Sequence, residues 1–325
     1  MHQPLDALMY SLIIPVYRNE ANLPHLLQAL CDMHAQTDQP LEVVLVVDGS
    51  PDNCYTLLRE QLPHMPFASQ LLLHSRNYGS FAAIRTGLNA ANGDYFAVMA
   101  ADLQEPPELA LAFFETLAAD RADVTLGVRD SRQDTPFSRW SAGVFWWAYR
   151  RWVMPDMPPG GVDIFGCNRQ FRNELLQLEE HHSSLVGLVF WLGFRRQEIA
   201  YQRRARQHGT SAWTLRKKIN YLLDSVFAFS DLPVKLLIAG GLAGVIFSLA
   251  FGLIVIALKA AGSVAVPGYA ATVLTVLFFG ALNTMGLGII GAYVWRAYSN
   301  TQKRPLAVVQ RAEQFRPDTP LKETP

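Results

Sequence analysis

Two polar side chains follow a short apolar segment in the first third of the chain. Residues 95–99 are apolar or aromatic, and Asp102 and Gln104 come shortly after them, ahead of Pro106 and Pro107. In open α/β sheets, ligands bind beyond the carboxyl ends of the strands, where these two side chains would lie. Their hard oxygen atoms suit a Mg²⁺ or Mn²⁺ ion that carries a diphosphate. An ordinary capped turn is the alternative interpretation, because Asp ahead of Pro-Pro is common turn chemistry.

Predicted strands and helices alternate through the first hundred residues. We expect strands at 10–16, 41–47, 70–74 and 95–99, and helices at 23–33, 51–61 and 81–91. The strand segments lack polar alternation, which is typical of strands covered on both faces. The predicted fold class is therefore α/β, with a mostly parallel sheet and helices on both faces. No Gly-x-Gly-x-x-Gly motif follows the first strand and no Walker lysine is present, so neither a dinucleotide domain nor a P-loop is supported.

Two long segments near the end of the chain contain no charged residue. They run over 236–258 and 269–295, and each is long enough to cross a bilayer as a helix at about 1.5 Å per residue. The alternative is two buried helices of a large soluble core, but helices of that length in soluble domains normally show a polar face. We therefore predict two C-terminal transmembrane helices.

Basic residues flank these two segments on the same side. They precede the first segment at 216–218 and 235 and follow the second at 296, 303 and 304, whereas the connecting loop has only Lys259. By the positive-inside rule, both termini should be cytoplasmic. We expect a cytoplasmic catalytic domain over 1–230, a membrane domain over 231–298 and a cytoplasmic tail over 299–325. The expected location is the inner (plasma) membrane of a bacterial cell.

Short polar turns follow the predicted strands. They read Pro-Val-Tyr-Arg-Asn-Glu at 15–20, Asp-Gly-Ser-Pro-Asp at 48–52 and Arg-Asn-Tyr-Gly at 76–79, ahead of Asp-Leu-Gln at 102–104. In this order the turns resemble the family 2 glycosyltransferases, which have the GT-A fold. The resemblance implies a divalent cation, Mg²⁺ or Mn²⁺, on Asp102 and Gln104. It also implies that a UDP- or GDP-linked sugar is bound by Pro15, Tyr17, Glu20, Asp48, Arg76, Asp102 and Gln104.

Some positions depart from the family pattern. Ala100 stands where the family usually has the first acid of Asp-x-Asp, and Val47 stands where many relatives have an acid. Ala212 replaces a common lysine, and Ala292 replaces an acid in the second span. A non-catalytic membrane subunit that binds nucleotide or lipid is therefore a hypothesis from another class, against which the retained Asp-Leu-Gln segment argues.

The second half of the predicted catalytic domain carries an acid and a group of basic residues. Segment 160–163 ends in Asp163 and resembles the family's acceptor site, and 203–217 resembles its Arg-x-x-Arg-x-x-Gly-x-Ser stretch. With two C-terminal spans, the pattern is similar to the polyprenyl-phosphate glycosyltransferases, the branch that includes bactoprenol glucosyltransferases and relatives of dolichol-phosphate mannose synthase. A solvated basic face is the alternative for the cations. The resemblance implies that the lipid phosphate is bound by Arg203, Arg206, Ser211 and Lys217.

The expected reaction is an inverting transfer of a sugar from a nucleotide sugar to a polyprenyl phosphate. A lipid phosphate is ionised near pH 7, so it needs little help from a base, and Asp163 orients the acceptor or takes a residual proton. Asp102 with its metal, and cations such as Arg76 and Arg129, would stabilise the leaving diphosphate. The product would serve cell-surface glycan synthesis, such as that of lipopolysaccharide or cell wall. The bilayer is a further expected partner, a homo-oligomer is left open, and no nucleic acid is expected.

Three further interpretations remain. One concerns the reaction, and two concern particular segments of the chain. A glycosyltransferase that elongates a glycan or polysaccharide is the alternative in the same class, but Gln-x-x-Arg-Trp is absent. The aromatic and basic segment 139–153 predicts an interfacial helix that leads the lipid to the site, and ordinary core packing is the alternative. The apolar segment 183–194 is too short to span a membrane and predicts a helix of the catalytic domain.

Overall fold

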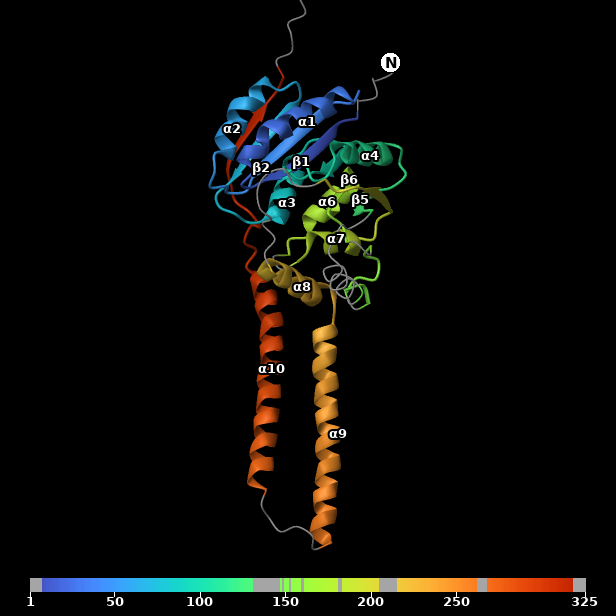
Figure 1. Cartoon of the computed structure of the whole chain (residues 1–325), viewed down its shortest axis with the longest axis vertical. Coiled ribbons are helices and arrows are strands. Elements are labelled where there is room, and N and C mark those ends of the chain that lie inside the picture. Colours follow the sequence, from blue (N-terminus) through green and yellow to red (C-terminus); the bar gives the residue numbers. More distant parts are fainter. Residues whose placement is uncertain are drawn as a thin grey trace, which may run out of the picture. The chain divides into compact units, whose positions relative to one another are not determined.

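The computed structural model describes residues 8–130, 147, 149–151, 153–158, 161–180, 183–204, 215–261 and 268–317 (Figure 1). The chain forms two compact units. Unit 1 comprises Met1–Glu179, Ser184–Leu215 and Arg304–Pro325, and unit 2 comprises Glu180–Ser183 and Arg216–Lys303. Unit 1 therefore contains nearly every residue that the sequence analysis assigns to chemistry.

Unit 1 is built on one mixed sheet. Its strands are β1 (Tyr10–Val16), β2 (Leu41–Val47), β3 (Ala68–His74), β4 (Tyr95–Val98), β5 (Val124–Arg129), β6 (Ile164–Asn168), β7 (Arg196–Tyr201) and β8 (Val309–Phe315). Their order across the sheet is β7-β5-β6-β4-β1-β2-β3-β8. The pairs β1–β2, β1–β4, β2–β3 and β5–β7 are parallel, and β3–β8, β4–β6 and β5–β6 are antiparallel. The predicted α/β class with a mostly parallel sheet is confirmed.

Apolar side chains on both faces explain why the central strands form. Every residue of β2 is buried, and in β1 only Pro15 is partly exposed. Burying such runs removes about 25 cal/mol of unfavourable hydration per Å² of apolar surface. The bounds predicted for β1 and β2 agree with the structure, whereas β3 begins two residues earlier than predicted and β4 ends one residue earlier.

Helices connect the strands of unit 1 and pack on the sheet. They are α1 (Leu23–Ala35), α2 (Cys54–Gln61), α3 (Ser80–Ala90), α4 (Pro107–Ala118), α6 (Arg169–Gln177) and α7 (Leu185–Trp191), with short 3₁₀ turns at Glu20–Asn22 and Leu62–His64. α2 begins at Cys54 rather than at Pro51, because Asp52 accepts hydrogen bonds from Ser50 Oγ at 2.6 Å and Cys54 N at 3.4 Å and holds a turn there. α7 confirms the helix predicted within 183–194.

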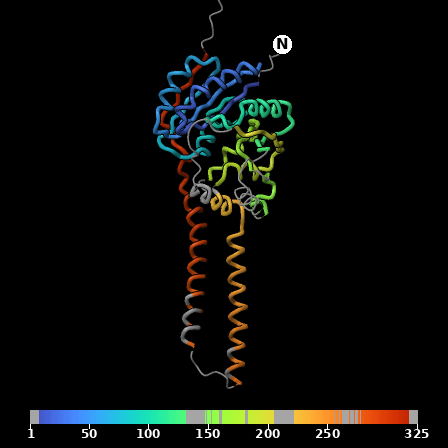
Figure 2. Tube along the Cα trace, viewed as in Figure 1, coloured from blue at the N-terminus to red at the C-terminus, as the bar shows by residue number. Residues whose placement is uncertain are grey.

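The last strand of the sheet comes from the C-terminal end of the described chain. β8 pairs antiparallel with β3 over Ser69–His74, although the sequence analysis assigns 299–325 to a tail. Figures 1 and 2 show this red strand among the blue N-terminal elements. Its sequence, Val-Gln-Arg-Ala-Glu-Gln-Phe, has no apolar run and is mostly exposed, so hydrophobic patterning alone does not predict it.

Unit 2 contains α8 (Leu215–Phe229) apart from its first residue, α9 (Leu232–Ala260) and α10 (Tyr269–Thr301). Among the residues that the structure describes, two helical segments are long and apolar enough to cross a membrane, Leu232–Leu258 and Phe278–Thr301. Large apolar side chains along them are exposed, for example Leu253 and Leu287. Two C-terminal apolar helices that could span a membrane are therefore present, as predicted.

Only part of the segment 139–153 lies within the described residues. Trp147 is 57% exposed, whereas Tyr149 is buried. The interfacial helix predicted for this segment otherwise lies outside the described residues and stays a prediction.

Candidate active site

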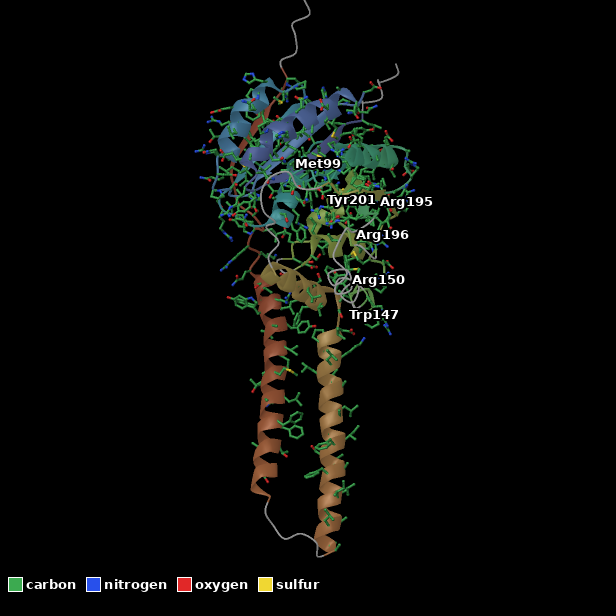
Figure 3. All side chains as sticks on the ribbon, viewed as in Figure 1. Met99, Trp147, Arg150, Arg195, Arg196 and Tyr201 are labelled. Carbon is green, nitrogen blue, oxygen red and sulfur yellow. The ribbon has the colours of Figure 1, made fainter. Side chains whose placement is uncertain are left out.

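The predicted substrate-binding residues lie at one edge of the sheet of unit 1. β1 to β4 run parallel, and β5 and β7 run in the same direction, so their carboxyl ends share this edge, where the antiparallel β6 begins. Met99 and Tyr201, labelled in Figure 3, follow β4 and end β7. The edge carries polar side chains from seven strand ends: Tyr17, Asp48, Arg76, Asp102, Arg129, Asp163 and Tyr201.

Asp48 is the centre of a buried hydrogen-bond network after β2. Its carboxylate accepts from the backbone N–H groups of Tyr78 at 2.8 Å and Gly79 at 2.7 Å. His74 Nδ1 lies 2.8 Å from the same carboxylate, and His74 Nε2 lies 2.9 Å from Thr86 Oγ1. Both Asp48 and His74 are buried. The network fixes the loop that follows β3.

This network gives Asp48 a positioning role that the sequence analysis did not foresee. The sequence predicts that Asp48 contacts the nucleotide, but both of its carboxylate oxygens are engaged inside the protein. Gly49 has φ of +56°, and a Cβ there would lie 2.2 Å from the carbonyl carbon of Arg76. The exposed Arg76 side chain lies over the Tyr78 ring at 4.1 Å. Arg76 is therefore exposed where a ligand can reach it, whereas the Tyr78 ring is partly covered and packs edge-to-face on the buried His74 ring at 5.5 Å.

The turns after β1 and β2 are tied to each other. The Glu20 carboxylate accepts from Asn53 N at 3.0 Å and from Asn53 Nδ2 at 3.2 Å. Arg18, with φ of +54°, donates its N–H to Ser50 Oγ at 2.8 Å. Glu20 thus holds the start of α2, while Pro15 and Tyr17 stay partly exposed beside it.

The turn after β4 places Asp102 and Gln104 at the same edge. Leu103 N donates to Ala100 O at 3.3 Å, and Gln104 N donates to Asp102 Oδ1 at 3.3 Å. Leu103 has φ of +54°, a conformation that non-glycine residues seldom adopt and that clusters at functional sites. The sequence pattern found this turn but could not show its strain.

Glu105 is a buried carboxyl group beside this turn. The residue is 3% exposed, and its Oε2 has no hydrogen-bond partner among the described residues. Burial raises the pKa of Glu105 to about 7, the nearby Arg203 guanidinium opposes that rise, and the charges of Asp102 and Asp163 add to it. The sequence analysis missed Glu105, which is adjacent to the Asp-Leu-Gln motif.

Asp163 is held by two neighbours from β5 and β7. Arg129 donates to it from Nε at 2.5 Å and from Nη2 at 2.6 Å, and the Tyr201 hydroxyl donates at 2.6 Å. Burial lowers the pKa of Arg129, but the hydrogen bonds and charge of Asp163 outweigh it and raise the pKa above its usual value. Burial and the adjacent Asp163 charge raise the pKa of Tyr201. Arg129, expected to face the diphosphate, here orients Asp163, and Tyr201 was not predicted.

Arg203 lies against the turn that carries Gln104. Its Nη2 donates to Gln104 Oε1 at 2.5 Å, and its Nε lies 3.9 Å from Glu105 Oε1. The backbone N–H of Arg204 donates to Gln104 O at 2.9 Å. Of the other predicted lipid-phosphate residues, Arg206 and Ser211 lie outside the described residues, and Lys217 is in α8 of unit 2.

The turn after β4 offers the Asp102 carboxylate as a ligand for a divalent cation. The Asp102 carboxylate is a hard oxygen ligand, and Glu105, whose Oε2 has no hydrogen-bond partner in the part of the chain that the structure describes, adds a second carboxyl group nearby. Gln104 Oε1 is engaged by Arg203. Within the described ranges, no group of three His, Cys, Asp or Glu side chains is placed to hold a metal. Asp102 therefore fits a cation whose other ligands would come from a bound diphosphate and water.

Comparison with known proteins gives consistent matches along the chain. The model of glycosyl transferase family 2 matches residues 11–178. The chain is 31% identical over 307 residues to the uncharacterized glycosyltransferase sll0501 of Synechocystis sp., covering 92% of this chain and 94% of that protein. It is 30% identical over 316 residues to the undecaprenyl-phosphate 4-deoxy-4-formamido-L-arabinose transferase of Pseudomonas aeruginosa, covering 97% and 92%.

Solved structures of lower identity also match. The mannosyltransferase PcManGT from Pyrobaculum calidifontis, in complex with GDP-Man and Mn²⁺, has a TM-score of 0.46 and 20% identity, covering 91% of this chain and 86% of that one. Staphylococcus aureus TarS in complex with UDP has a TM-score of 0.38 and 18% identity, covering 59% and 57%.

Proposed function

Because this chain belongs to glycosyl transferase family 2 and is a glycosyltransferase, we propose that it transfers a sugar from a nucleotide sugar to a polyprenyl phosphate. The reaction inverts the anomeric carbon, and the product is a lipid-linked sugar used in cell-surface glycan synthesis. The contact between Arg203 and Gln104 carries this proposal, since it joins the arginine expected on the lipid phosphate to the turn expected on the diphosphate. The donor diphosphate and the acceptor phosphate would lie near that point, on opposite sides of the anomeric carbon.

The similarity to relatives supports a lipid acceptor. An enzyme with 30% identity over 316 residues is named for undecaprenyl phosphate, and the alignment includes the two apolar helices because it covers 97% of this chain. A polyprenyl chain is insoluble in water, so an enzyme that uses it needs contact with the membrane. Helices α9 and α10 would supply that contact.

The donor would lie across the turns that follow β1, β2, β3 and β4. Pro15, Tyr17 and Arg76 face the ligand, while Asp48 and Glu20 hold the turns in place. A Mg²⁺ or Mn²⁺ ion on Asp102 would neutralise charge on the leaving diphosphate when bound. The guanidinium of Arg76 would supply further positive charge near it.

The acceptor needs little activation. Its phosphate oxygen attacks the anomeric carbon, the bond from that carbon to the diphosphate oxygen breaks, and the electron pair leaves with the diphosphate. Because the attacking phosphate is already ionised near pH 7, Asp163 would orient the acceptor rather than remove a proton in the main step. Arg129 and Tyr201 fix the rotamer of Asp163 for that task.

The proposed location is the cytoplasmic face of the inner membrane. The basic flanks of both apolar segments support cytoplasmic termini and a cytoplasmic catalytic domain. The chain connects the catalytic unit to α9 through 205–214 and α8, and it returns from α10 to β8 through 302–308. Both ends of the membrane segment thus lead into the same unit.

Membranes that contain the protein test this proposal. They are incubated with UDP- and GDP-linked sugars one at a time and with a short polyprenyl phosphate, and the lipid extract is examined by mass spectrometry. We expect one donor to give a sugar-phosphate lipid, and membranes with Asp102→Asn to give none. Transfer to a growing glycan without any lipid-linked sugar would contradict the proposal.

A further inference from the structure

β8 lies beside the loop that we assign to the donor nucleotide. We infer that β8 is a positioning strand for this reaction: it braces the carboxyl end of β3 and so holds loop 75–79 in the shape that binds the nucleoside diphosphate. This inference rests on the proposed function, because the loop is assigned to the donor there. It gives the C-terminal segment a role in substrate binding that its sequence does not suggest.

The pairing of β8 reaches the loop itself. The register pairs Ser69 with Phe315 at one end and His74 with Val309 at the other. One residue further, Ser75 N donates to Val308 O at 3.0 Å. The backbone pairing with β8 therefore extends to Ser75, the residue before Arg76. Arg76 is the exposed cation of the donor loop.

His74 connects the β3–β8 pairing to the buried hydrogen-bond network around Asp48. Its backbone pairs with β8, and its ring contacts Asp48 and Thr86. Asp48 in turn accepts the N–H groups of Tyr78 and Gly79. A shift of β3 at His74 would therefore move the carboxylate that shapes the loop. The close approach of Gly49 to the backbone of Arg76 leaves little room for the loop to compensate.

Side chains of β8 also hold α2, which follows the second donor turn. Glu313 accepts hydrogen bonds from the Tyr55 hydroxyl and from Arg59 Nε, the latter at 3.0 Å. Arg311 lies over the Tyr55 ring at 5.9 Å. Since α2 is also held by Glu20 through Asn53, β8 joins two of the turns that form the donor side of the site.

β8 is attached by few apolar contacts. Val308 and Val309 are 45% and 41% exposed, and only Glu313 and Phe315 of the strand are partly covered. Strands held mainly by backbone pairing open more readily than the core does. Suppose that the pairing of β8 with β3 favours donor binding by a given free energy. Donor binding must then stabilise that pairing by the same free energy.

Amide hydrogen exchange on the unmodified full-length protein in detergent tests this reciprocity. The probes are uridine diphosphate and guanosine diphosphate, each with Mg²⁺. We expect the nucleotide that slows exchange at 75–79 also to slow exchange across 309–315, by at least about threefold, as linkage requires. Protection of 75–79 without any protection of 309–315 would overturn the inference. If neither nucleotide protects 48–52 or 75–79, the proposed donor site fails instead.

A pair of variants provides the second test. Glu313→Ala removes the bonds to Tyr55 and Arg59, and Gln310→Ala is the matched control on the same exposed strand. We expect Glu313→Ala to weaken nucleotide binding at least about threefold by calorimetry, because it removes the side-chain contacts that join β8 to α2. The apparent affinity for polyprenyl phosphate should not change. Lower thermal stability with unchanged nucleotide affinity would show a merely structural strand and contradict the inference.

Discussion

Arg203 donates a hydrogen bond from Nη2 to the side-chain oxygen of Gln104 at 2.5 Å. The two residues are 99 positions apart in the sequence, and one follows β7 whereas the other follows β4. The contact places a cation beside the turn that contains Asp102. Under the proposed function, the donor and acceptor parts of the site would therefore share a boundary rather than form two separate halves.

The first prediction concerns this boundary. Arg203→Ala should weaken the apparent affinity for polyprenyl phosphate by about tenfold, because one charge-assisted bond is worth roughly 1.5–3 kcal/mol. Nucleotide-sugar binding, followed by calorimetry, should change by less than about threefold. Arg203→Lys is the control, since it keeps the charge and loses the fork geometry. If donor binding collapses while lipid affinity is unchanged, Arg203 belongs to the diphosphate subsite alone.

The second prediction concerns the cation. Asp102→Asn should abolish sugar transfer and weaken Mn²⁺ binding, because the carboxylate is the hard ligand that the turn supplies. Ala100→Asp should preserve transfer or tighten Mn²⁺ binding by restoring a second acid. Calorimetric titration with Mn²⁺ in the presence of nucleoside diphosphate measures both effects. Transfer by Asp102→Asn in excess chelator would show that no cation on Asp102 is required.

The third prediction concerns the orientation of Asp163. Tyr201→Phe removes the hydroxyl that lies 2.6 Å from the Asp163 carboxylate and leaves the Arg129 contact in place. We expect kcat to fall about tenfold, in keeping with one charge-assisted bond, while KM for both substrates stays within about twofold. Tyr95→Phe, on β4, is the matched control. Unchanged kcat in Tyr201→Phe would show that the Tyr201 hydroxyl does not orient Asp163 for the reaction.

The fourth prediction concerns stability in acid. Asp123 accepts hydrogen bonds from Arg195 and Asn168, and the bond to Arg195 is the main cause that lowers the pKa of Asp123. A lowered pKa means that this carboxylate stabilises unit 1 above its unfolded pKa, near 3.9, and that the contribution is lost as pH falls through the folded pKa. Asp123→Asn should therefore lower the melting temperature at pH 7. The difference from wild type should shrink as pH falls below about 4; a difference that is constant with pH would contradict it.

The fifth prediction concerns the membrane. The loop between the two apolar helices should face away from the cytoplasm, because the lone Lys259 is outweighed by the basic flanks. Ser263→Cys should react in intact cells with a membrane-impermeant thiol reagent, and Thr301→Cys should react only after lysis. If Thr301→Cys reacts in intact cells and Ser263→Cys reacts only after lysis, the catalytic unit would lie outside the cytoplasm, where its nucleotide sugar is absent.

The sequence predicts the parts of the site that depend on local patterns. The strands that precede Asp102, Gln104 and Arg76 contain clear apolar runs. The sequence could therefore predict that these residues lie at one edge of the sheet. The partners of Asp163 and Asp48 could not, because Tyr201 and His74 come from distant segments whose pairing depends on the tertiary fold. β8 was missed for a related reason. Its stability comes from pairing with β3, and its own residues are polar and exposed.

The central claim is that a polyprenyl phosphate accepts the sugar directly. Purified protein, supplied with its nucleotide sugar, should release nucleoside diphosphate only when a short polyprenyl phosphate is present, and one lipid-linked sugar should form for each nucleoside diphosphate released. Both quantities can be measured in one reaction by chromatography and mass spectrometry. Release of nucleoside diphosphate at the same rate without the lipid, or release with no sugar on the lipid, would contradict the account.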